Sequence, residues 1–121
     1  MAKQILIVDD EKALARALEL KLIHEGFEVE IVFNGTDAIK TLKNKSFDLV
    51  LLDLVMPQED GFAVLEKIEP KKKKMLVIVS SNLSQTEDIE KAKSLGATDY
   101  IVKSDTTLAK IVEKIEKYLD K

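Results

Sequence analysis

The sequence contains no cysteine and a single histidine, and these two shortages exclude several kinds of chemistry. Without cysteine there is no disulfide, no thiol nucleophile and no thiolate metal ligand, and one histidine cannot supply the cluster typical of a zinc site. That histidine, His24, stands at the end of a predicted helix beside Glu25 and Gly26, where we expect it to face solvent. Any metal bound by this chain would therefore have oxygen ligands.

Long apolar runs and an excess of positive charge are also missing. No stretch approaches the roughly 20 apolar residues that a membrane-spanning helix needs. The N-terminus, Met1 to Gln4, lacks the apolar core and the cleavage site of a signal peptide, so we expect a cytoplasmic protein. The net charge of −3 argues against direct binding of nucleic acid, which requires clustered cations in excess.

What the sequence does contain predicts one α/β domain. The chain has 121 residues, 45% hydrophobic and 34% charged, and we expect a single globular domain over residues 1–121. Apolar runs predict five strands, at residues 5–8, 27–31, 49–52, 76–79 and 100–102. Apolar residues at helical spacing predict five helices, at residues 12–25, 35–42, 62–68, 84–95 and 108–119.

Two of the connecting segments have signals of their own. Ser84 and Glu87 have the spacing of a capping box, which predicts a helix that opens at Ser84. Pro70 is expected to end the third helix, and the segment Lys71 to Lys74 is then expected to be a solvated loop. A basic docking patch is the alternative interpretation of those lysines.

The alternation of strands and helices implies parallel strands joined by right-handed crossovers, with helices on both faces of the sheet. The second strand alternates Val29 with Glu28 and Glu30, so one of its faces should be exposed to solvent, and we expect it at an edge of the sheet. The fifth strand is short, which also suits an edge. We therefore adopt the flavodoxin-like order 2-1-3-4-5, a three-layer doubly wound fold that places both strands at edges.

Polar side chains stand where the predicted strands end: Asp9 and Asp10, Asp53, Ser80 or Ser81, and Lys103. Parallel strands all finish at one edge of the sheet, so these side chains should gather there, next to the reversal point that ligands prefer. Two simpler interpretations stay open. Taken singly, Asp53 could satisfy loop amides, and Asp10 could cap the first helix.

The charge of this edge predicts a metal ion. Three carboxylates and one ammonium group leave about −2 in a confined site, and two like charges 4 Å apart repel by about 4 kcal/mol at an effective dielectric constant of about 20. A divalent cation would cancel this charge, and oxygen-only ligands favour Mg²⁺, with Mn²⁺ as the alternative. A metal, an ammonium group and a hydroxyl together stabilise a transferring phosphoryl group, and Asp53 can attack phosphorus to give an aspartyl phosphate.

Taken in order, these residues resemble the receiver domain of two-component response regulators, of the stand-alone type known from chemotaxis. The likeness covers residues 5–119, and the matching pieces are the pair Asp9-Asp10, the run D-L-V-M-P-Q-E-D-G from Asp53, a hydroxyl after the fourth strand, G-A-T-D-Y from Gly96, and Lys103. Each piece alone is a weak signal, but five in order, each at a strand end, are specific. The resemblance implies a phosphorylation-activated signalling switch.

The resemblance also implies a role for each residue of the site. Asp53 would accept the phosphoryl group from a phosphohistidine on a sensor histidine kinase or a histidine phosphotransfer protein. Asp10 and Asp53 would bind Mg²⁺ with the backbone carbonyl of Val55, Asp9 would help through water, and Lys103 would pair with the phosphoryl group. The oxygens of the phosphoryl group would also accept hydrogen bonds from the backbone N–H groups of Leu54, Val55 and Asn82.

A hydroxyl and an aromatic residue would transmit the signal. Family spacing favours Ser81 over Ser80 as the switch hydroxyl. Phosphorylation would draw Ser81 inward and let Tyr100 move into the vacated space, which would alter the partner-binding face made by the fourth helix, the fifth strand and the fifth helix. Ordinary packing is the alternative for Tyr100. We expect a monomer or a weak phosphorylation-dependent dimer, without membrane insertion.

The sequence departs from the family pattern near the site. Ser104 follows Lys103 where the family usually has proline, so the loop there is expected to differ. Asn82 is larger than the residue usual after the switch hydroxyl. Val55 and Leu83 are apolar where many members carry polar side chains that steer an attacking water, so we expect slow autodephosphorylation. The chain would then catalyse its own modification without being a turnover enzyme.

Three other classes fit the sequence less well. An aspartate-nucleophile phosphatase usually has a second aspartate two residues after the nucleophile, where this chain has Val55. A flavodoxin-like nucleotide carrier needs a Gly/Ser/Thr-rich loop after the first strand, whereas Asp9 and Asp10 would repel a phosphate. A receiver that is never phosphorylated usually lacks acidic residues that are present here.

Overall fold

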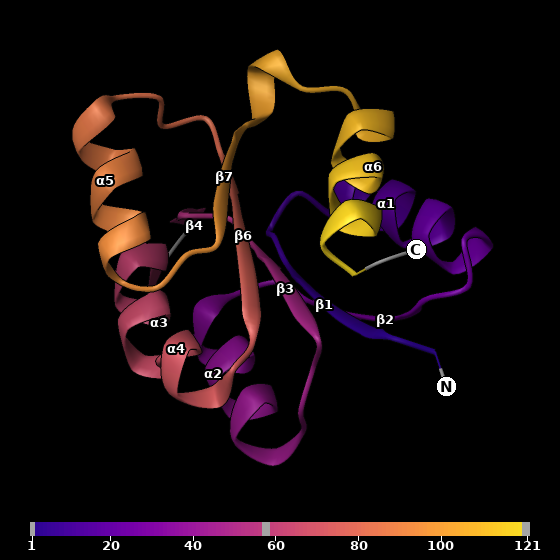
Figure 1. Cartoon of the computed structure of the whole chain (residues 1–121), viewed down its shortest axis with the longest axis horizontal. Coiled ribbons are helices and arrows are strands. Elements are labelled where there is room, and N and C mark those ends of the chain that lie inside the picture. Colours follow the sequence, from indigo (N-terminus) through magenta and orange to yellow (C-terminus); the bar gives the residue numbers. More distant parts are fainter. Residues whose placement is uncertain (1, 57–58, 120–121) are drawn as a thin grey trace.

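A five-stranded parallel sheet forms the centre of the computed structural model, which describes residues 2–56 and 59–119 (Figure 1). Its strands are β1 (Gln4–Val8), β2 (Glu28–Val32), β3 (Leu49–Leu52), β6 (Leu76–Ser81) and β7 (Asp99–Val102). They lie in the order β2-β1-β3-β6-β7, and every neighbouring pair is parallel. The predicted order 2-1-3-4-5 is confirmed, because the labels β4 and β5 belong to a separate two-stranded hairpin.

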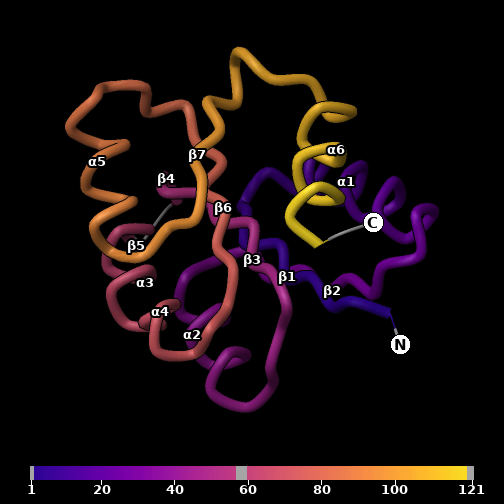
Figure 2. Tube along the Cα trace, viewed as in Figure 1, coloured from indigo at the N-terminus to yellow at the C-terminus, as the bar shows by residue number. Residues whose placement is uncertain are grey.

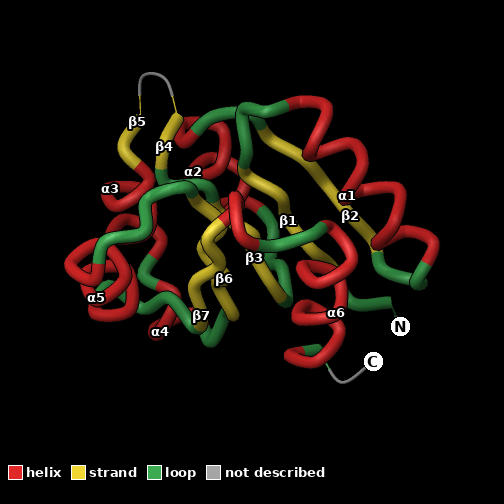
Figure 3. The backbone as a smooth tube through the Cα atoms, turned by 90° about the horizontal axis from the view of Figure 1, so that it is seen from above, coloured by secondary structure: helices red, strands yellow, loops and turns green. Residues whose placement is uncertain are grey.

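Helices cover both faces of the sheet. They are α1 (Lys12–His24), α2 (Gly35–Asn44), α3 (Gly61–Ile68), α4 (Pro70–Lys73), α5 (Thr86–Ser94) and α6 (Leu108–Tyr118). α1 and α6 pack on one face, whereas α2, α3 and α5 pack on the other (Figure 3). The Cα trace shows the same arrangement, with the strands between the two groups of helices (Figure 2).

Alternation along the buried strands divides the core into two clusters. In β1, Ile5 and Ile7 face α1 and α6, whereas Leu6 and Val8 face the helices of the other layer, and all four side chains are buried. Burial on both faces explains why residues 5–8 of β1 and all of β3 are continuously apolar. β2 pairs only with β1, and β7 only with β6, so both predicted edge positions are confirmed.

The segment after α3 is helical where the sequence predicted a loop. Pro70 opens the short helix α4, because its fixed φ suits the first position of a helix and its missing N–H is not needed there. Glu69 and Lys74 flank α4 in the left-handed region, with φ of 46° and 53°. The lysines of this segment are exposed, as predicted. A proline expected to end one helix therefore begins another.

One other local prediction is corrected, and one is confirmed. Between Asp53 and α3, β4 (Val55–Met56) and β5 (Glu59–Asp60) form an antiparallel hairpin, and Pro57 lies outside the described residues. The capping box at Ser84 is wrong: α5 begins at Thr86, and its N-cap is Gln85, one residue after Ser84, which makes no side-chain capping bond. His24 is exposed at the end of α1, as predicted.

Across residues 2–56 and 59–119, no helix combines the length and the apolar composition that crossing a bilayer requires.

Candidate functional site

The carboxyl ends of β1, β3 and β7 bring the predicted charged residues together. Asp9 and Asp10 follow β1, Asp53 follows β3, and Lys103 begins the 3₁₀ turn η1 (Lys103–Asp105) after β7. A backbone hydrogen bond from the Asp53 N–H to the Val8 carbonyl, 2.9 Å long, ties the ends of the two central strands together. Figure 3 shows β1, β3 and β7 from above, in one sheet.

Three carboxylates at this edge form a group that could hold a metal ion. Asp9, Asp10 and Asp53 each offer one oxygen, and these oxygens lie within 4.8 Å of one another. Asp9 and Asp53 are buried, with 3% and 4% of their surface exposed, and Asp10 is half-buried. An all-oxygen set fits a hard cation such as Mg²⁺ better than zinc, which prefers nitrogen and sulfur ligands.

The structure also bears on the simpler interpretations of two of these aspartates. Asp10 does not cap the first helix, because the N-cap of α1 is Glu11 and no side chain makes a capping bond there. Asp53 does satisfy a loop amide, since its Oδ1 accepts a hydrogen bond from the Val55 N–H at 3.1 Å. Its Oδ2, however, accepts a hydrogen bond from Lys103 Nζ, so only one of the two carboxylate oxygens serves the loop.

Lys103 is surrounded by carboxylates. Its Nζ lies 2.8 Å from Asp9 Oδ2, 3.1 Å from Glu11 Oε1 and 3.2 Å from Asp53 Oδ2. Burial by itself would lower the pKa of Lys103, but the hydrogen bond to Asp9 and the charges of Asp53 and Asp9 outweigh burial, so the pKa is raised. The ammonium group therefore stays protonated and is the fixed positive charge of the site.

The surroundings of Asp53 disfavour the ionised form of its carboxyl group. Burial raises its pKa from 3.8 to about 6. The hydrogen bond from the Val55 N–H and the charge of Lys103 lower the pKa, and the charge of Asp9 raises it, but burial prevails. A cation bound next to Asp53 would favour the ionised form, which is the form that can act as a nucleophile.

Two serines end β6, and both are buried, with 2% of Ser80 and 0% of Ser81 exposed. Ser81 is linked to the loop that follows, because its Oγ accepts a hydrogen bond from the Leu83 N–H at 3.2 Å. Tyr100 on β7 donates its hydroxyl hydrogen to the Leu83 carbonyl at 2.6 Å. Burial raises the pKa of Tyr100, and a hydrogen bond with Ser81 opposes the rise. The two predicted switch residues therefore meet around Leu83.

Two residues that shape the site were not predicted from the sequence. Glu11 reaches Lys103 from the start of α1, and the only signal for it was a third acid after Asp9 and Asp10. Gly61 begins α3 directly against the loop that carries Asp53, and a Cβ atom at position 61 would lie 2.4 Å from the Leu54 Cα. This close approach depends on the path of the backbone, which the sequence pattern does not indicate.

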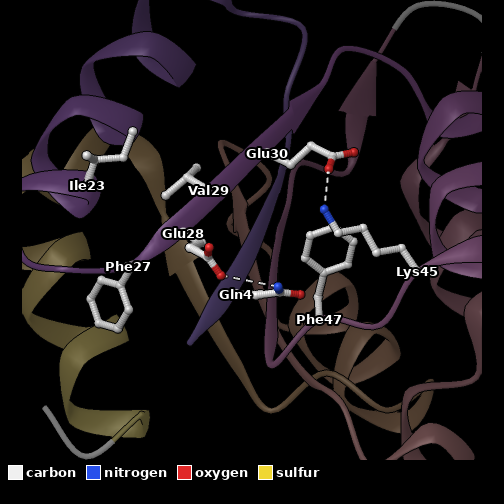
Figure 4. A pocket seen from close by; sticks show the side chains of 8 residues that line it. All are labelled: Gln4, Ile23, Phe27, Glu28, Val29, Glu30, Lys45 and Phe47. Carbon is white, nitrogen blue, oxygen red and sulfur yellow. Dashed lines mark hydrogen bonds and ion pairs between the residues drawn. The ribbon is translucent and has the colours of Figure 1, made fainter. Parts of the chain in front are cut away.

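A hollow elsewhere on the molecule is not part of this site. It lies along the outer edge of β2, where Ile23, Val29 and Phe47 supply apolar walls beside Glu28 and Glu30 (Figure 4). Among the described residues, Asp9, Asp10 and Asp53 do not line this hollow.

The chain is similar to known proteins over most of its length. A family model described as the response regulator receiver domain matches residues 5–116. Over 100 residues the chain is 39% identical to the response regulator ArlR of Staphylococcus aureus, a match that covers 83% of this chain and 45% of ArlR. The chain thus spans about half the length of the curated relatives it matches.

Solved structures are similar over almost the whole chain. A CheY-like response regulator receiver domain protein from Methanospirillum hungatei is 32% identical, with a TM-score of 0.92 and coverage of 99% of this chain and 95% of that one. The phosphorylated cyanobacterial phytochrome response regulator RcpA is also 32% identical, with a TM-score of 0.86 and coverage of 98% and 94%.

Proposed function

The chain belongs to the response regulator receiver domain family, and on this premise we propose that it is a phosphorylation-activated switch of a two-component system or phosphorelay. Asp53 accepts a phosphoryl group from a phosphohistidine on a sensor histidine kinase or a histidine phosphotransfer protein. What supports this most directly is the position of Asp53, a buried carboxylate between the Lys103 ammonium group and two further carboxylates.

The transfer needs a nucleophile, and it needs positive charge next to the phosphoryl group that is being transferred. An oxygen of the Asp53 carboxylate forms the new P–O bond while the P–N bond to the donor histidine breaks, and the imidazole keeps the electron pair of that bond. Lys103, 3.2 Å from Asp53 Oδ2, neutralises charge on the phosphoryl oxygens. Further hydrogen bonds come from the Ser81 hydroxyl and from the backbone N–H groups of Leu54, Val55 and Asn82.

Asp9, Asp10 and Asp53 are the side chains that would hold Mg²⁺, or Mn²⁺, together with the Val55 backbone carbonyl. Their chemistry fits such a cation, because three carboxylate oxygens lie within 4.8 Å of one another. A bound divalent cation would offset the negative charge of these carboxylates and of the incoming phosphoryl group. The raised pKa of Asp53 supports this assignment, because the fold alone compensates the ionised form poorly.

Phosphorylation is read out, in this proposal, on the face formed by α5, β7 and α6, the fourth helix, fifth strand and fifth helix of the sequence prediction. Ser81 and Tyr100 both bind the backbone of Leu83, so a Ser81 hydroxyl drawn toward a phosphoryl group would release one of the bonds that hold this loop. A shift of Tyr100 would follow and change the surface offered to a downstream protein. The protein acts as a monomer or a weak phosphorylation-dependent dimer.

Incubation with Mg²⁺ and acetyl phosphate, followed by intact mass measurement, tests the phosphoacceptor function. We expect one phosphoryl group per chain, which hydroxylamine removes because it is an acyl phosphate, and none when EDTA removes the cation. An unchanged mass in Mg²⁺ would contradict the proposal, and so would a phosphoryl group that resists hydroxylamine.

The aspartyl phosphate should hydrolyse slowly, so the protein is a switch and not a turnover enzyme. Val55, two residues after Asp53, is apolar and 56% exposed, and Leu83, two residues after Ser81, is apolar as well. Neither side chain can hydrogen-bond a water that attacks phosphorus. Val55 and Leu83 therefore cannot orient a water molecule for attack on the phosphoryl group.

The Val55→Asn variant should lose its phosphoryl group about tenfold faster than wild type, because one oriented water is worth about 1.4 kcal/mol of barrier. The measurement is the decay of the phosphorylated mass after acetyl phosphate is removed by desalting. Val55→Ile keeps an apolar side chain at this position and should decay like wild type. Slower decay in Val55→Asn would show that the apolar side chain is not what protects the acyl phosphate.

A further inference from the structure

We propose that Glu11 is a positioning residue that holds the Lys103 ammonium group in place while Asp9 and Asp53 are engaged by the cation and the phosphoryl group. This inference rests on the proposed function and adds a residue to it. Lys103 Nζ has three carboxylate partners, and two of them, Asp9 and Asp53, also belong to the group of carboxylates that would hold the metal. Glu11, 3.1 Å from Nζ, does not belong to that group. It is the partner that stays available when the site is loaded.

The backbone of Glu11 is fixed on both sides, so its side chain starts from a defined position. Its N–H donates to Asp9 Oδ1 at 2.9 Å, and its carbonyl accepts from the Ala15 N–H at 3.0 Å. The Glu11 side chain is 56% exposed, whereas that of Lys103 is 9% exposed. Glu11 therefore reaches inward from the mouth of the site and joins the start of α1 to η1, although the two residues are 92 positions apart.

The place of Glu11 in α1 argues against a purely structural role. Glu11 is the N-cap, where Ser, Thr, Asp and Asn are favoured because their short side chains accept hydrogen bonds from the first turn. Glu11 makes no such bond, and no acidic residue lies in the first turn of α1. By contrast, α2, α3 and α6 are capped by the side chains of Asn34, Asp60 and Thr107. The chain leaves α1 without a cap and directs this carboxylate to Lys103 instead.

Negative charge at the mouth of the site is the competing explanation for Glu11, and side-chain length separates the two. Aspartate at position 11 would keep the charge and could cap α1, but it is one methylene group shorter and would not reach Lys103. Glutamine would keep the reach and an acceptor oxygen but would lose the charge. Serine would cap α1 and lose both the reach and the charge.

Time courses of phosphorylation by acetyl phosphate in saturating Mg²⁺, followed by intact mass, test the proposal. The maximal rate constant and the half-saturating concentration are read separately from a series of acetyl phosphate concentrations. We expect Glu11→Ser and Glu11→Asp to lower the maximal rate constant about three- to tenfold without raising the half-saturating concentration, and Glu11→Gln to fall between them and wild type. In metal-free buffer the melting temperatures of the Ser and Asp variants should rise by a few degrees, because α1 gains a cap.

Gln85→Ser is the matched control for the gain of a cap. Gln85 is the N-cap of α5 and, like Glu11, makes no side-chain capping bond. This variant should raise the melting temperature in the same way and be phosphorylated at the wild-type rate. Together, the two helix starts separate an effect of capping from an effect on Lys103.

Two results would overturn the role of Glu11. The first is a wild-type maximal rate in Glu11→Ser, and the second is wild-type behaviour in Glu11→Asp, which would leave charge alone as the cause. If wild type itself takes up no phosphoryl group, the proposed function and the role of Glu11 fall together. If wild type takes up a phosphoryl group and Glu11→Ser does so at the wild-type rate, only the role of Glu11 is contradicted.

Discussion

The Asp53→Asn variant should take up no phosphoryl group from acetyl phosphate in Mg²⁺ and, in metal-free buffer, should be more stable than wild type at neutral pH. An amide is a poor nucleophile toward phosphorus, so its mass should stay unchanged. The gain in stability arises because the substitution removes a charge that the fold accommodates poorly. Burial raises the pKa of Asp53 from 3.8 to about 6, in spite of the nearby Lys103.

The pH dependence follows from the direction of this shift. Because the pKa of Asp53 is higher in the folded than in the unfolded chain, its protonation stabilises the fold, fully below about pH 4, and this contribution is lost as the pH rises through about 6. The rise in the pKa of Asp53 from 3.8 to about 6 corresponds to about 3 kcal/mol. Asparagine resembles the protonated form at every pH, so the free energy of unfolding of Asp53→Asn should exceed that of wild type by up to this amount above about pH 6.

Urea unfolding in EDTA at about pH 4 and about pH 7.5 measures this difference, and added Mg²⁺ should stabilise wild type more than the variant. Asp48→Asn is the matched control at the other end of β3. Its carboxylate accepts a hydrogen bond from the Gln4 N–H at 2.7 Å, which an asparagine oxygen can also accept. Asp48→Asn should be phosphorylated like wild type. A phosphoryl group on Asp53→Asn would reveal a different acceptor, and equal stability at about pH 7.5 would show that Asp53 is not penalised by burial.

The acidic edge could be predicted because it depends only on where strands end. Continuous apolar runs place β1 and β3 inside a parallel sheet, and the residues after them, Asp9 and Asp53, must then lie at the same margin. Lys103 follows from the same rule applied to β7. Side-chain reach does not enter this reasoning, so the spacing of the polar residues along the chain was sufficient.

Contacts that depend on side-chain direction or on close backbone approach could not be predicted in this way. Glu11 was one acid in a run of three, and only the position of η1 brings Lys103 within 3.1 Å of it. Pro70 is compatible with the end of one helix or with the first turn of the next. The two residues with left-handed backbone that flank α4 are Glu69 and Lys74 rather than glycines, so the sequence does not indicate this conformation. The contact of Tyr100 with the Leu83 carbonyl likewise depends on a side-chain rotamer.

Gly61→Ala should destabilise the fold by about 3 kcal/mol or more and should also slow phosphorylation of the folded protein. A Cβ atom at position 61 would lie 2.4 Å from the Leu54 Cα, 2.7 Å from the Asp53 carbonyl oxygen and 2.9 Å from the Leu54 carbonyl oxygen. All three are backbone atoms, so no side chain can rotate away, and α3 or the loop after β3 must move. Because that loop carries Asp53, the same movement displaces the proposed nucleophile from Lys103.

Thermal unfolding should show the loss as a fall in melting temperature of about 10 °C, and phosphorylation is compared at a temperature where both proteins are folded. Gly96→Ala is the matched control, because the same methyl group there meets side-chain atoms, the Pro70 ring at 3.2 Å and Lys71 Cγ at 3.6 Å, and its cost comes from a φ of +111°. It should destabilise by about 1–2 kcal/mol and leave the phosphorylation rate unchanged, since it lies before β7 and Lys103 follows that strand. A wild-type melting temperature in Gly61→Ala would show that α3 can move away at little cost. A wild-type rate in a destabilised Gly61→Ala would show that the position of Asp53 does not depend on this contact.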